Sequence, residues 1–221
     1  MATIEEITLA DEPHAWSSLG FDVRDGSCTL GSVVVNLAGA GAREHEGPGA
    51  GLVGWRLRDI ASAELDGLPT TLGTSAAPPP GGGRHPNAIT AIDHVVAVSP
   101  DLDRTIATLQ AAGLDLRRVR EEPTPAGAPR QGFFRLDEVI LEVVQEPGEV
   151  SERHGGSDRP AHFWGLALIS ADLDATAAAF APHCGEVRDA VQAGRRIATV
   201  RRSAGLSVPV ALMSAVGEAV A

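Results

Sequence analysis

The chain has 221 residues, of which 43% are apolar, and a formal net charge of −11. This length allows one large or two small domains with a real core, and the negative charge disfavours nucleic acid and anionic membranes as partners. The sequence contains no tyrosine and no lysine, and the lack of lysine excludes Schiff-base chemistry. Its two cysteines, Cys28 and Cys184, are far apart in the sequence, which excludes a Cys-type zinc site. No apolar run comes near the roughly 20 residues that cross a bilayer, which excludes a membrane span. The start lacks an apolar signal core, so we expect a cytoplasmic protein.

The N-terminal 72 residues show a faint pattern of strands and one helix. The pattern predicts strands over 4–9, 21–24 and 52–57 and a helix over 11–19. In addition, the segment 30–37 matches 136–143 in its order of apolar and polar residues, with Asn36 at the position of Glu142. We therefore expect residues 1–72 to be a degenerate β-α-β-β-β-like module.

A linker is expected to follow this module. The run Ala-Ala-Pro-Pro-Pro-Gly-Gly-Gly at 76–83 supports no buried element, because proline stiffens the chain and glycine frees it. We place the linker over residues 73–89.

Two later stretches are near copies of each other. Residues 92–103 read IDHVVAVSPDLD, and residues 163–174 read FWGLALISADLD. Each copy is an apolar run, then Ser-x-Asp-Leu-Asp, then a helical pattern, so residues 90–214 are expected to contain one small unit twice. The copies differ at one chemically important position, where His94 of the first matches Gly165 of the second.

The elements expected in the first copy give the order β-α-β-β-β. Ser99 is expected to cap the helix with Pro100 in its first turn, and Gly113 to end it. The strands are predicted over residues 92–98, 114–119, 130–135 and 139–145. The second copy predicts a strand over 163–169, a helix over 172–181, a weak strand from residue 187, and strands over 196–201 and 207–213. The two modules are thus residues 90–147 and 160–214.

Paired modules of this kind, with a histidine on the first strand and a glutamate on the last, resemble the vicinal oxygen chelate superfamily. This group includes glyoxalase I, bleomycin resistance proteins and extradiol dioxygenases. The resemblance covers about residues 90–214. It implies an α+β fold in which paired β-α-β-β-β modules form a curled mixed sheet around a cavity that takes a small molecule.

The resemblance also implies a metal site. In the family, each module supplies one ligand from its first strand and one from its last. By position, His94 and Glu142 are the ligands of the first module, and Glu142 is also the expected catalytic residue. In the second module, Gly165 and Ala211, the expected equivalent of Glu142, cannot bind a metal.

A third ligand could come from His85, Gln192, His162 or the partner in a homodimer. The cofactor is accordingly either one divalent ion (zinc, nickel, manganese or iron) or none.

Alternation along the strands extends the candidate site. If Leu141 and Val143 face the helix, Glu142 faces the cavity, with Phe133 opposite it on the hairpin and Gln131 on the same face. We therefore expect Gln131 and Phe133 to contact substrate.

The turn that contains Gln192, Arg195 and Arg196 could clamp a carboxylate or phosphate, or could be plain surface charge. Trp164, next to Gly165, is expected to face the core.

Three functions remain open from the sequence. The first is a glyoxalase-like, divalent-metal-dependent lyase, isomerase or dioxygenase for a small oxygenated metabolite. The second is a metal-free protein that binds or sequesters a small molecule without catalysis. The third is an assembly role with no site. The number of metal ligands separates the first two, and an open cavity separates the second from the third.

Overall fold

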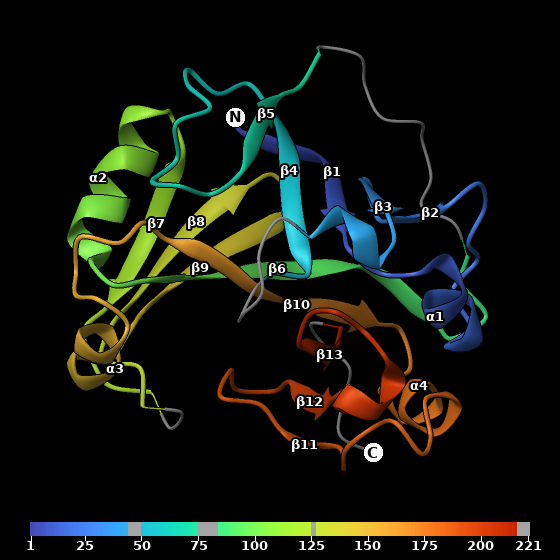
Figure 1. The fold of residues 1–221 in the computed structure, drawn as a ribbon. Coiled ribbons are helices and arrows are strands. Elements are labelled where there is room, and N and C mark those ends of the chain that lie inside the picture. The colour runs from blue at the N-terminus through green and yellow to red at the C-terminus, as the bar shows by residue number, and fades with distance from the viewer. Residues whose placement is uncertain (44–49, 75–83, 125–126, 216–221) are drawn as a thin grey trace.

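The computed structural model describes residues 1–43, 50–74, 84–124 and 127–215, and its strands form two mixed sheets (Figure 1). The N-terminal sheet has the order β2-β3-β1-β4-β5. Its strands are β1 (Thr3–Leu9), β2 (Ser27–Leu30), β3 (Val33–Leu37), β4 (Leu52–Arg58) and β5 (Thr70–Leu72), and helix α1 (Pro13–Ser18) follows β1. Most of the predicted linker, residues 75–83, lies outside the described residues.

The second sheet has eight strands in the order β11-β12-β13-β10-β6-β9-β8-β7, so β11 and β7 are open edges. Its strands are β6 (Ile89–Ser99), β7 (Asp115–Arg120), β8 (Gln131–Leu136), β9 (Val139–Gln145), β10 (His162–Ser170), β11 (Arg188–Asp189), β12 (Arg196–Thr199) and β13 (Val210–Ser214). The helices are α2 (Leu102–Ala111), α3 (Gly148–Arg153) and α4 (Leu173–Ala179), with short 3-10 turns at Ala40–Ala42 and Arg202–Ala204. None of the helices in the described ranges is long and apolar enough to cross a membrane.

The predicted repeat is present in atomic detail at the two helix starts. The hydroxyls of Ser99 and Thr105 lie 2.6 Å apart, as do those of Ser170 and Thr176. One detail of the prediction is wrong: the N-cap is Asp101, whose side chain accepts from the backbone N–H of Arg104. Ser99 instead accepts from the N–H of Asp101, which leaves Pro100 outside the helix.

Strand pairing makes the two modules equivalent. In each one the first strand runs parallel to the last, β6 beside β9 and β10 beside β13, and the modules join through the antiparallel pair β6–β10. Val96 pairs with Glu142, and Ala167, which lies at the same place in the repeat, pairs with Ala211. The register therefore confirms Ala211 as the counterpart of Glu142.

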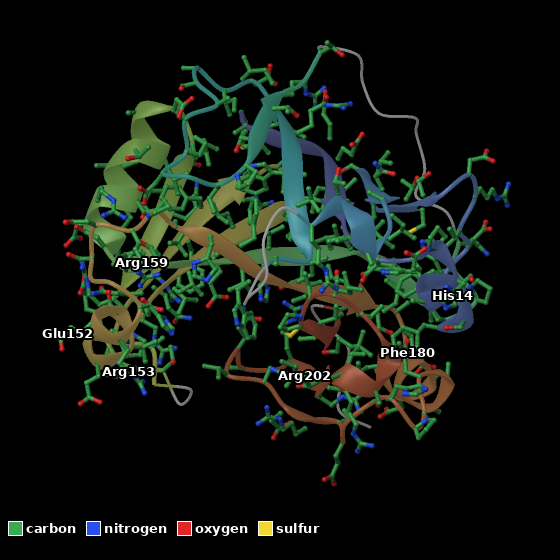
Figure 2. The ribbon with its side chains drawn as sticks, viewed as in Figure 1. His14, Glu152, Arg153, Arg159, Phe180 and Arg202 are labelled. Carbon is green, nitrogen blue, oxygen red and sulfur yellow. The ribbon has the colours of Figure 1, made fainter. Side chains whose placement is uncertain are left out.

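The N-terminal elements follow the same pairing with one strand fewer. β1 runs parallel to β3, and the pair Leu30–Val33 closes the β2–β3 turn as Leu136–Val139 closes the β8–β9 turn. The strand predicted over residues 21–24 is wrong. Phe21 is instead drawn into the core, where its ring packs 4.6 Å from that of Trp16 and 6.0 Å from that of Phe180, which lies beside α1 (Figure 2).

Helices α2 and α4 pack on the two ends of the large sheet. α2 contacts β7, β8 and β9, and α4 contacts β12 and β13. The α2 side chains Leu102 and Leu109 are buried in the same apolar cluster as Phe134 and Leu141, each worth roughly 1.5–3 kcal/mol on burial. Since Leu141 is buried, period-two alternation turns Glu142 to the opposite face of β9.

Candidate functional site

A large cleft of about 1840 Å³ opens on the face of the eight-stranded sheet to which Glu142 is turned. Alternate residues of the central strands line it, namely His94, Val96 and Val98 of β6, Gln131 and Phe133 of β8, and Glu142 and Val144 of β9. Residues of β7, β10, β11, β12 and β13, of α3 and of the N-terminal strand β4 also line it. Gln131, Phe133, His94 and Glu142 therefore share one cleft, and for Gln131, Phe133 and Glu142 this agrees with the strand alternation in the sequence.

A row of paired residues runs across the cleft wall. Arg118 pairs with Phe133, Phe133 with Glu142, and Glu142 with Val96. The guanidinium carbon of Arg118 lies 5.0 Å from the centre of the Phe133 ring, a cation–π contact. Arg120 lines the same wall two residues further along β7. Neither arginine was identified from the sequence, although β7 reads Asp-Leu-Arg-Arg-Val-Arg.

Glu142 is the central acid of the cleft. Its Oε2 lies 3.5 Å from Nε2 of His94, and its Oε1 accepts a hydrogen bond from the side-chain amide of Gln131. Burial raises the pKa of Glu142 above its ordinary value, although the nearby His94 and the bond from Gln131 act in the opposite direction. A half-buried carboxyl with a raised pKa beside a histidine is well suited to general acid–base chemistry.

A β-bulge at Asp93 orients His94. In the β6–β10 pairing, Ala167 faces His94 and Leu168 faces Ile92, so Asp93 is the extra residue. Ordinary alternation would put Asp93 and His94 on opposite faces, but here Oδ2 of Asp93 lies 2.8 Å from Nδ1 of His94. The apolar residues Ile92 and Val95 are both buried but lie three residues apart, whereas a regular strand repeats every two residues. This spacing is the signal in the sequence that could have revealed the bulge.

Arg195 contacts this pair from the second module. Its Nη1 lies 2.7 Å from Oδ1 of Asp93. Burial opposes the ionisation of Asp93, but the bonds to His94 and Arg195 outweigh it, and the pKa of Asp93 is lowered. The result is a chain of polar contacts from Arg195 through Asp93 and His94 to Glu142. Asp93 was not among the residues predicted from the sequence.

The other predicted residues are dispersed. Gln192 and His162 line the cleft, whereas Arg195 and Arg196 are not among its lining residues. Nη1 of Arg196 pairs with Asp174 at 2.8 Å, outside the cleft. His85 lies away from the cleft, where its ring bonds the backbone N–H of Asp22 and the carbonyl of Thr29.

Trp164 corrects a further expectation. It was expected to face the core, but it lines the cleft and remains 42% exposed. The sequence pattern missed this orientation because the β6–β10 register shifts between Phe163 and Gly165, which alters the alternation along β10.

A second acidic group lies toward the α3 end of the cleft. Glu146 is buried, and its carboxylate contacts Nδ1 of His154 at 3.1 Å and the guanidinium of Arg159, which is labelled beside α3 in Figure 2. Burial works against ionisation here too, but these two partners lower the pKa of Glu146. Glu146 is therefore held as an anion and differs in character from Glu142.

The donor set does not fit a resident metal held by this chain. Within the described ranges, no three His, Cys, Asp or Glu side chains are grouped so that they could hold an ion. The second module cannot supply a ligand at Gly165, because a Cβ there would lie 2.5 Å from the carbonyl oxygen of Pro209. His94 and Glu142 give two ligands, fewer than the three that catalytic metal sites usually have.

Comparison with known proteins shows what parts of the chain are similar to. Residues 91–198 match the model of the Glyoxalase/Bleomycin resistance protein/Dioxygenase superfamily. Among solved structures, the methylmalonyl-CoA epimerase from Mycobacterium tuberculosis is 18% identical, with a TM-score of 0.46 over 57% of this chain and 89% of that one.

A variant of the Streptomyces coelicolor methylmalonyl-CoA epimerase, in complex with 2-nitronate-propionyl-CoA, is 20% identical, with a TM-score of 0.46 over 58% of this chain and 99% of that one. The search of curated proteins found no match.

Proposed function

Residues 91–198 belong to the glyoxalase/bleomycin resistance/dioxygenase superfamily, and we propose that they form an enzyme that moves a proton on a small oxygenated acid, with Glu142 as the acid–base group. The observation that carries this proposal is the half-buried carboxyl of Glu142 in an open cleft, 3.5 Å from His94, where burial raises its pKa. An open cleft also favours small-molecule functions over a purely assembling role.

The chemistry follows from the neighbours of Glu142. A raised pKa makes its carboxylate a stronger base, suited to take a proton from a carbon next to a carbonyl group and to return it as the neutral acid. The electron pair of the broken C–H bond then moves onto the carbonyl oxygen as an enolate. Arg118 and Arg120 supply positive charge on the same wall, and this favours an anionic substrate.

The expected ligand has one charged and one apolar part. The second module contributes small or apolar lining residues, including Ala167, Ala211 and Met213, together with the polar residues Arg188, Gln192 and Thr199. The apolar residues among them also support the second candidate, a metal-free protein that binds a small acid without changing it. Binding without proton exchange would distinguish that candidate.

A metal-dependent activity is less well supported by the residues present. A divalent ion on His94 and Glu142 would supply a Lewis acid, but two ligands leave it weakly held. A homodimer that brings a further donor to the cleft stays a prediction. Light scattering during gel filtration tests it.

The test of acid–base function is hydrogen exchange at carbon. Pyruvate, acetoacetate, dihydroxyacetone phosphate and one acyl-CoA thioester are incubated with the protein in D2O, and proton NMR follows loss of the C–H signals. Wild type is expected to exchange at least one probe, and Glu142→Gln to be slower by about 100-fold or more. Glu122→Gln, which alters an exposed carboxylate of the same cleft, is the control. Equal rates in all three proteins would refute the role of Glu142.

A further inference from the structure

The guanidinium of Arg195 is fixed almost entirely by the second module. Nε and Nη2 donate to the carbonyl oxygen of Ser214 at the end of β13, at 3.0 and 2.8 Å, and Nη1 donates to Oε1 of Gln192 at 3.1 Å. The side chain is 9% exposed. The remaining contact of Nη1 is Asp93, in the first module. A cation held by this many acceptors has little freedom to follow its partner, so it can fix the position of Asp93.

We propose that Arg195 is a positioning residue for the His94–Glu142 pair: it holds the Asp93 carboxylate so that His94 keeps its proton on Nδ1 and presents Nε2 to Glu142. This inference rests on the proposed acid–base function of the same cleft. It replaces the expectation that Arg195 clamps a substrate, because the carboxylate that it binds belongs to its own chain.

The hydrogen-bond donors and acceptors around Asp93 and His94 support this role. The two carboxylate oxygens of Asp93 each contact a nitrogen, Nη1 of Arg195 and Nδ1 of His94, so the group serves as a hydrogen-bond acceptor for both. With Oδ1 held by Arg195, Oδ2 accepts from Nδ1 of His94, and a neutral imidazole then has its lone pair on Nε2. That lone pair faces Oε2 of Glu142 and can accept the proton of a neutral carboxyl group.

The contacts of Arg195 with Asp93 and of Asp93 with His94 have no equivalent in the second module, and they connect the two modules. The position equivalent to Asp93 in the second module is Trp164, and that equivalent to His94 is Gly165. The acid–base pair thus sits in the first module, while the cation that orients it comes from the turn before β12. Because Gln192 both lines the cleft and contacts Arg195, this turn joins the cleft lining to the orienting contact.

The test reads the tautomer of His94 by two-bond ¹H–¹⁵N NMR of the ligand-free protein, at a pH where the imidazole is neutral. The chain has seven histidines, so the His94 signals are assigned by their loss in His94→Gln. Wild type is expected to carry the proton on Nδ1. In Asp93→Asn, Arg195 should hold the amide oxygen and turn the amide NH2 toward Nδ1, which moves the proton to Nε2.

Replacing Arg195 as well should prevent this move of the His94 proton from Nδ1 to Nε2. The double variant Asp93→Asn/Arg195→Gln is expected to show mixed tautomers, because the amide is free to flip, and Arg195→Gln alone to weaken the preference for Nδ1. Arg196→Gln, at the neighbouring arginine that pairs with Asp174, is the matched control and should keep the wild-type spectrum.

A wild-type proton on Nε2, an unchanged tautomer in Asp93→Asn, or equal spectra of the Arg195 and Arg196 variants would each overturn the proposal. Because Asp93→Asn is isosteric, the test survives if Arg195→Gln does not fold. A tautomer is recorded without any substrate, so failure here is distinct from failure of the exchange assay.

Discussion

Glu142 on β9 and Ala211 on β13 occupy the same position in the last strands of their modules, since each pairs with the equivalent residue of the first strand, Val96 or Ala167. Both line the cleft. The duplicated fold therefore presents a carboxylate on one side of the cleft and a methyl group on the other, which concentrates the titratable chemistry in the first module.

This asymmetry predicts weak metal binding that one substitution can strengthen. In calorimetric titrations with nickel, zinc and manganese, wild type should bind weakly, and His94→Ala and Glu142→Gln should bind less. Ala211→Glu should bind more tightly, because it adds a carboxylate opposite the existing pair. Affinity should fall on acidification, since an imidazolium cannot ligate. Identical binding by all four proteins would remove His94 and Glu142 as ligands.

Gly165 is expected to tolerate no side chain. A Cβ at this position would lie 2.5 Å from the carbonyl oxygen of Pro209, so Gly165→Ala must displace β13. We expect a loss of about 1–3 kcal/mol in the free energy of unfolding, measured with urea. Gly148→Ala is the control, because a Cβ there meets nothing within 4 Å. Equal stability of the two variants would contradict this account of the close approach.

The raised pKa of Glu142 predicts a stability that depends on pH. The fold favours the neutral carboxyl, so Glu142 contributes stability below its ordinary pKa of about 4.5, and this contribution is lost as the pH rises through the raised value. Glu142→Gln should therefore unfold at the same urea concentration as wild type near pH 4, and at a higher one at pH 8. The control Glu122→Gln, at an 80% exposed side chain, should show no such trend.

Asp66 is predicted to hold the N-terminal region against the repeat. Its carboxylate accepts from Nε of Arg104 at 3.0 Å and from the hydroxyl of Thr105. Asp66→Ala should lower the free energy of unfolding by about 2 kcal/mol, because it removes the carboxylate that accepts the hydrogen bond from Arg104. The control is Asp59→Ala, at an exposed side chain whose contact with Arg58 spans 3.7 Å.

Limited proteolysis tests the proposed division of the chain. If residues 1–72 are a folded module and 73–89 a linker, early cleavage of the native protein should fall within 73–89 and spare 3–57. Rapid cleavage throughout 3–57 would contradict the division. In Asp66→Ala we expect cleavage of the N-terminal part to accelerate relative to wild type, because one of its contacts with the repeat is lost.

Sequence patterns were most successful where the signal was local or repeated. The duplicated Ser-x-Asp-Leu-Asp segments gave both helix starts to within a few residues, and β9 was predicted with its observed bounds. They failed at residues 21–24, where aromatic packing against Trp16 and Phe180 overrides strand propensity. They also failed at Trp164, because alternation cannot anticipate a register shift in the partner strand.

The sequence by itself determined the repeat, the α+β class, the resemblance to the superfamily, and the alternation that turns Glu142, Gln131 and Phe133 to one face. These features depend on neighbours along the chain or on period-two geometry. Only the tertiary structure decided the contacts of Asp93 and Arg195, which are 102 positions apart in the numbering and meet because β6 bulges beside β10. It also decided that Gly165 cannot be a ligand position, since the obstacle is the backbone of Pro209, a through-space contact that no local pattern encodes.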